Sequence, residues 1–105
     1  MKYNYTRIDV KAGRTVKLTL THTGKMAKKI MGHNLVILKK DVDLTAFALS
    51  AGKAKSTDYI PEDAADKIVA MTKLIGGGKS TTVEFAAPEA GTYNFLCTMP
   101  GHFAM

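Results

Sequence analysis

The residues of this chain that are best suited to chemistry stand near its C-terminal end. Cys97 is the only cysteine, His102 follows five residues later, and Met105 is the last residue. A second histidine, His33, lies far upstream behind Gly32. One thiolate, two imidazoles and a thioether form the soft, mixed ligand set that suits a redox-active copper ion. A closed structural zinc site needs four strong ligands, and one cysteine with two histidines is one short.

The segment between the cysteine and the histidine favours a tight turn. Cys97 ends a predicted strand, and Pro100-Gly101 would return His102 to the thiolate. Proline at this turn also removes one backbone donor, which matters where hydrogen bonds to the sulfur tune a reduction potential. Taken singly, a lone cysteine is usually a small buried core residue. The joint pattern favours a metal site over that interpretation.

Length and composition predict one domain over residues 1–105. Apolar residues make up 46% of the chain, which is enough for a hydrophobic core, and no apolar run is long enough to span a membrane. The net charge of +6 comes from 15 basic and 9 acidic residues and favours encounter with acidic partners. Binding to nucleic acid is a weaker interpretation of this charge, because the basic residues are scattered and all are lysines except Arg7 and Arg14.

Several segments alternate polar and apolar residues, as half-buried strands do. The first such segment is 7–10, and Ala12-Gly13 after it predicts a turn. The strands predicted beyond it cover 15–23, 34–38, 67–74, 80–85 and 91–96, and the apolar run of 34–38 indicates burial on both sides. Residues 43–52 instead have helical spacing, with Asp43 as the expected cap and Gly52 as the expected stop. An all-β, Greek-key β-sandwich with one short helical insertion is therefore predicted.

A glycine run at 76–78, followed by Lys79-Ser80, is similar to the end of a phosphate-binding loop. That motif requires a glycine where Lys73 stands and a helix afterwards. Because residues 80–85 alternate like a strand, we interpret the run as a glycine-rich hairpin loop.

The two ligand segments also carry a family resemblance. Met31-Gly32-His33-Asn34 and 97–102, together with the segments 58–61 and 72–76, resemble the corresponding segments of azurins. Azurins are small blue-copper proteins of the cupredoxin fold, and the resemblance covers nearly the whole chain. It implies that His33, Cys97 and His102 bind copper as a trigonal set. It also implies a long-range axial contact from the Gly32 carbonyl and an outer position for Asn34, which would hold the ligand loops together.

The resemblance is incomplete around the remaining axial ligand. Met105 stands eight residues after Cys97, one position nearer than the axial methionine of azurins. Either Met105 is the axial ligand of a contracted loop, or the true ligand was the next residue and is lost. Azurins also have a strand before the position of Met1 and a final strand after this methionine, so we expect a trimmed chain with unpaired sheet edges. Met99 replaces the aromatic residue that is usual beside the cysteine.

The resemblance implies a one-electron carrier with one copper ion cycling between Cu(I) and Cu(II), and not an enzyme. An apolar collar around the edge of His102, formed by Met31, Met99, Pro100, Phe103 and Ala104, would dock redox proteins such as c-type cytochromes or copper oxidoreductases. The protein would be periplasmic, monomeric or weakly oligomeric, with any export signal removed. His22 aligns with an azurin histidine near the copper, but a plain strand-end histidine is an equal interpretation.

Two other functions use the same residues. A copper storage or delivery module would hold the ion with the same ligands and exchange it readily. Thiol catalysis by Cys97 and His102 is disfavoured, because no residue is evident to orient the histidine and a hydrolase would not need His33.

Overall fold

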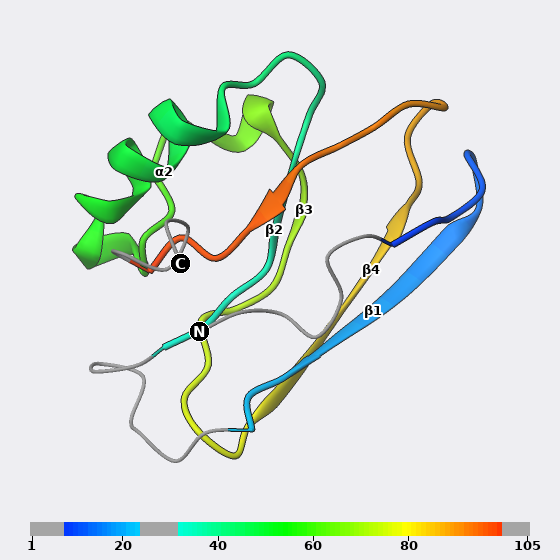
Figure 1. Cartoon of the computed structure of the whole chain (residues 1–105). Coiled ribbons are helices and arrows are strands. Elements are labelled where there is room, and N and C mark those ends of the chain that lie inside the picture. Colours follow the sequence, from blue (N-terminus) through cyan, green and yellow to red (C-terminus); the bar gives the residue numbers. More distant parts are fainter. Residues whose placement is uncertain (1–7, 24–31, 100–105) are drawn as a thin grey trace.

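The computed structural model describes residues 8–23 and 32–99 (Figure 1). Two sheets form the frame. Strands β1 (Thr15–Thr21) and β4 (Ser80–Ala86) form an antiparallel pair. Strands β3 (Ile68–Met71), β2 (Val36–Leu38) and β5 (Phe95–Leu96) form a second antiparallel sheet in that order. Helix α2 (Leu44–Gly52) and two 3₁₀ turns, Lys55–Thr57 and Ala65–Lys67, connect β2 to β3.

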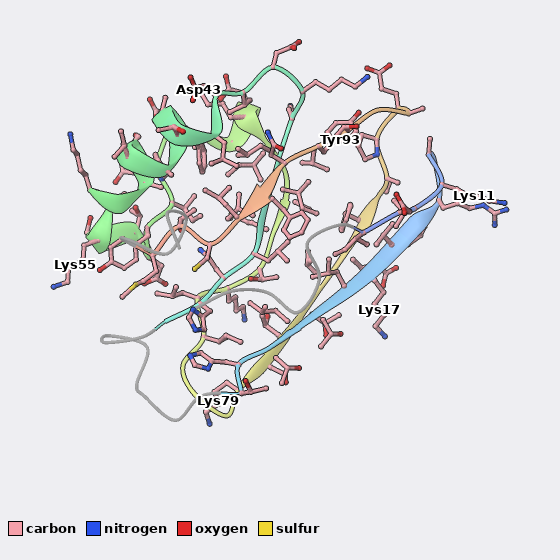
Figure 2. All side chains as sticks on the ribbon, in the orientation of Figure 1. Lys11, Lys17, Asp43, Lys55, Lys79 and Tyr93 are labelled. Carbon is pink, nitrogen blue, oxygen red and sulfur yellow. The ribbon has the colours of Figure 1, made fainter. Side chains whose placement is uncertain are left out.

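The β1–β4 pair follows the alternation of its sequence. Val16, Leu18 and the other apolar residues of β1 lie on the less exposed face. The opposite face is polar, and Figure 2 shows Lys17 projecting from it away from the other sheet. On this outer face the Thr19 and Thr82 hydroxyl oxygens lie 2.9 Å apart. Period-two patterning therefore predicted both strands, and the faces of β1, correctly.

The core lies between the second sheet and α2. Val36, Leu38 and Leu96 of the sheet pack with Phe47 and Ala51 of the helix. Val36 and Leu38 are fully buried, whereas Ile37 between them is half-buried, so β2 is less completely covered than its apolar run predicts. Burial of these side chains is the main stabilising contribution of the helical insertion.

Helix α2 begins and ends where the sequence indicates. The Asp43 carboxylate accepts a hydrogen bond from the Ala46 N–H at 3.0 Å, and Figure 2 places Asp43 at the start of the helix. This bond satisfies one of the donors that a helix N-terminus leaves unpaired. Gly52 is the last helical residue. The helix is too short to cross a membrane, and the same holds for every helix within the described ranges.

Three expectations need correction. Residues 8–10 form no strand, and Ile8 and Val10 are exposed, because no neighbouring strand pairs with them in the described structure. The 76–78 run is a turn but no hairpin, since β3 and β4 belong to different sheets. Strand β5 covers only Phe95–Leu96 of the predicted 91–96.

The segment before β5 is instead held by Lys40. The Lys40 ammonium donates a hydrogen bond to the Ala90 carbonyl at 3.0 Å and lies 3.5 Å from a Glu89 carboxylate oxygen. It also lies 5.8 Å from the centre of the Tyr93 ring, whose hydroxyl donates to the Glu89 carbonyl at 2.7 Å. The Lys40 chain occupies the space that a Cβ at Gly91 would need. These contacts fix the connection that leads into the cysteine-bearing strand.

Candidate metal centre

The segment that carries His33 is fixed by backbone pairing. The His33 N–H donates to the Ile75 carbonyl at 3.0 Å, and the Ile75 N–H donates to the His33 carbonyl at 2.9 Å. Gly32, directly before this bridge, is buried. His33 therefore has its main chain anchored on both sides of its Cα atom, which restricts where the imidazole can point.

Thr72 strengthens this anchor at Leu35, two residues after His33. The Leu35 N–H donates to the Thr72 hydroxyl at 2.9 Å, and the Thr72 N–H donates to the Leu35 carbonyl at 2.9 Å. The same hydroxyl donates to the Lys73 carbonyl at 3.0 Å. Thr72 is buried, so these bonds form in a region where an unpaired polar group would be costly.

The two predicted ligand segments are joined by Asn34 and Thr98. The Asn34 side-chain amide donates to the Thr98 hydroxyl at 2.8 Å, and its carbonyl oxygen accepts from the Thr98 N–H at 2.9 Å. Both residues are almost fully buried. Because Thr98 follows Cys97 and Asn34 follows His33, this pair brings the cysteine-bearing and histidine-bearing segments together.

The thiol of Cys97 lies in surroundings that suit a metal-bound thiolate. Only 2% of the residue is exposed, and this burial raises the pKa of the Cys97 thiol. The backbone N–H groups of Asn34 and Met99 hydrogen-bond to the sulfur and act in the opposite direction, but burial prevails. Two donors directed at a buried sulfur stabilise negative charge there, so the site fits a soft metal ion that displaces the proton.

His22 packs directly on the predicted ligand His33. The two ring centres are 4.1 Å apart, with the planes inclined by 30°, and His22 is buried. Its main chain is fixed by Gly78 and Lys79, which exchange backbone hydrogen bonds with it at 2.9 Å each. The sequence alone left His22 outside the site. Its alignment with an azurin histidine was the signal that could have placed it here.

Comparison with known proteins assigns this arrangement to a family. The model of copper-binding proteins of the plastocyanin/azurin family matches residues 1–105. The chain belongs to this family. This cupredoxin is 42% identical over 111 residues to azurin-2 of Alcaligenes xylosoxydans xylosoxydans, matching the whole chain and 84% of that protein.

Two further comparisons agree with this assignment. The outer membrane protein H.8 of Neisseria gonorrhoeae is 45% identical over 109 residues; the match includes the whole chain but spans only 58% of that relative's length. Auracyanin from Roseiflexus castenholzii superposes with a TM-score of 0.79 at 35% identity, covering 97% of this chain and 78% of that one. The predictions of an azurin-like protein, a cupredoxin β-sandwich and a copper cofactor are thereby confirmed.

The structure places only part of the predicted ligand set of this cupredoxin. Gly32, His33 and Cys97 lie at the junction described above, whereas His102 and Met105 lie outside the described residues. Within 8–23 and 32–99, no three histidine, cysteine or acidic side chains gather into a metal site by themselves. The ligand set therefore stays a prediction that requires His102.

The predicted apolar collar is likewise only partly described. Met31, Pro100, Phe103 and Ala104 lie outside the described residues. Met99 is 7% exposed, so it offers little surface to a partner. Thr72 and Thr98 were missed as site residues, because nothing in a single sequence distinguishes a buried threonine from an exposed one.

Proposed function

We propose that this cupredoxin is a one-electron carrier whose copper is bound by His33, Cys97 and His102. The Gly32 carbonyl and Met105 would complete the ligand set. When bound, copper supplies the one-electron couple between Cu(I) and Cu(II). The observation that carries the proposal is the buried Cys97 thiol with two backbone donors directed at its sulfur.

The contribution of the chain is to hold the ligands still. The Asn34–Thr98 pair fixes the cysteine segment against the histidine segment, and the Ile75 and Thr72 contacts fix the histidine segment against the sheet. The His22 ring restricts rotation of the His33 ring. Ligands that are held by packing and hydrogen bonds move little when the charge of the ion changes, and this favours fast electron transfer.

The proposed partners are redox proteins, and the proposed compartment is the bacterial periplasm. Support comes from the identity with azurins and from the relative named as an outer membrane protein. The net charge of +6 favours encounter with an acidic partner surface. Docking would be transient and would use the apolar edge around His102, because a carrier must release its partner quickly.

Visible absorption and EPR spectra after addition of Cu(II) test this proposal. We expect an intense blue band with a narrow copper hyperfine splitting, and Cys97→Ser should abolish both. Thr19→Ser, on the outer face of β1, is the matched control and should leave the spectrum unchanged. A Cys97→Ser protein that stays blue would refute the assignment of the thiolate.

The rate of copper loss to a chelator separates a carrier from a storage or delivery module. A carrier should retain its ion for much longer than a partner encounter lasts. Rapid and complete loss from a correctly blue protein would favour the storage or delivery function.

A further inference from the structure

A groove lies beside β3. Its volume is about 670 Å³, and it runs between the strand and the loop 57–62. Ile60 and Pro61 line it from the loop, and Val69 and Met71 line it from the strand. Met71 is 45% exposed, so an occupant of the groove could cover its apolar side chain.

The strand that lines this groove has an open edge. β3 is the end strand of its sheet, and its other side pairs with β2. Thr72 donates to Leu35 across that pair, and Met71 lies opposite Val36. Met71 is thus a non-hydrogen-bonded position, so its N–H and C=O point away from β2. In the described part of the chain, no strand pairs with this side of β3.

The opposite wall of the groove is rigid. Asp58 and Tyr59 both have left-handed backbone conformations, with φ of 53° and 64°. Such conformations are costly for residues other than glycine and persist only where surrounding contacts enforce them. Here the Tyr59 N–H donates to the Ala54 carbonyl at 2.9 Å, and the Thr57 hydroxyl donates to the Ile60 carbonyl at 2.6 Å. The groove is therefore preformed, which lowers the cost of binding.

The charges of the groove differ from those of the whole chain. Asp58 and Glu62 line the loop side and are both exposed, and Lys73 is the one basic residue among the lining residues. A chain with a net charge of +6 thus presents a locally acidic wall beside apolar side chains and an unpaired strand edge. An occupant with basic residues complements this wall.

We propose that the groove binds an extended, basic segment of a partner polypeptide, which adds to the open edge of β3 as a further strand. Backbone hydrogen bonds to Met71 would supply affinity, and alternate side chains would enter the groove. The bulge between Ile37 and Leu38 in the β2–β3 register limits the pairing to the end of β3 near Met71, because a bulge interrupts the regular edge. The groove contains none of the proposed copper ligands, but Asn34 and Thr72, which hold the ligand segments, line part of it.

A titration followed by ¹⁵N NMR tests this proposal on the diamagnetic, Cu(I)-loaded protein. The probe is a blocked heptapeptide in which valine alternates with lysine and threonine. We expect saturable shifts confined to 57–62 and 69–73, and hydrogen exchange of the Met71 amide slowed by about tenfold or more at saturation. A peptide N-methylated at alternate residues cannot pair with an edge and should not bind, and this control leaves the protein unaltered.

Charge variants test the choice of partner. Glu62→Gln should lower the affinity for the lysine peptide by about two- to fivefold, as expected for loss of an exposed ion pair. Glu84→Gln on β4 should leave this affinity unchanged. A peptide with glutamate in place of lysine should bind more weakly than the lysine peptide. Shifts elsewhere, equal binding of the N-methylated peptide, or β3 shifts that depend on protein concentration alone would overturn the proposal, the last because a second copy would then occupy the edge.

Discussion

Replacing Asn34 by alanine tests whether the contact between the two ligand segments holds the site together. The substitution removes two hydrogen bonds, one of 2.8 Å to the Thr98 hydroxyl and one of 2.9 Å from the Thr98 N–H. The Thr98 backbone donor is then left buried without its partner. A net contribution of about 1 kcal/mol for each of the two neutral bonds, and about 1–3 kcal/mol for the abandoned donor, predict a loss of about 3–5 kcal/mol in the free energy of unfolding.

Two further variants separate this effect from general damage. Thr98→Val removes only the bond to the hydroxyl, so it should cost about 1–2 kcal/mol, and its coupling with Asn34→Ala should be about 1 kcal/mol. Thr19→Val is the matched control, because the Thr19–Thr82 hydroxyl pair has a similar oxygen separation of 2.9 Å but is exposed. Its effect should stay within about 0.5 kcal/mol.

Urea unfolding of the metal-free protein is the appropriate assay, since a bound metal would add its own stabilisation by mass action. Copper loading should then give a weaker blue band for Asn34→Ala, because the Asn34 side chain no longer holds the cysteine segment. The reasoning fails if Asn34→Ala costs less than about 1 kcal/mol, below the range for a buried unpaired group. It fails equally if Asn34→Ala and Thr19→Val have the same effect.

Three other outcomes follow from the structure. Burial raises the pKa of the Cys97 thiol, so the thiol is protonated at pH 7. Binding of the redox-inert probe Zn²⁺ should therefore release about one proton and should weaken as the pH falls. Calorimetry should find that the Cys97→Ser variant loses this proton release. Asp43→Ala removes the α2 cap and should cost about 1 kcal/mol in urea unfolding, with Asp63→Ala as the neutral control. Leu38→Ala, at a fully buried position, should cost about 2–5 kcal/mol, whereas Leu49→Ala, at an exposed one, should cost far less.

Local periodicity in the sequence predicted β1, β4 and α2. The alternation of β1 and β4 and the helical spacing after Asp43 are properties of short windows, and each appears in the structure. Residues 91–94 alternate as well, but only Phe95–Leu96 form the strand, and Lys40 binds the Ala90 carbonyl directly before this segment. Alternation at Ile8 and Val10 failed for a related reason, because a strand also needs a neighbour.

The candidate site was likewise predicted only in part. The types and spacing of Cys97 and His33 indicated copper, because ligand chemistry is a property of the residues themselves. The contacts of Asn34 with Thr98 join residues that are 64 positions apart, and the packing of His22 on His33 depends on the meeting of two loops. Such contacts arise from tertiary structure, so residue patterns do not show them; the azurin resemblance implied the role of Asn34, but not Thr98 as its partner.

The Lys40 side chain also constrains how this chain can vary. Any residue with a Cβ atom at position 91 would displace the ammonium group from the Ala90 carbonyl and from Glu89. The end of the Lys40 side chain can move aside only by giving up these contacts, so a larger residue at position 91 is better matched by a shorter one at position 40. Among homologues that retain this connection, positions 40 and 91 should therefore change together, so that glycine accompanies a long basic side chain and a bulkier residue accompanies a short one.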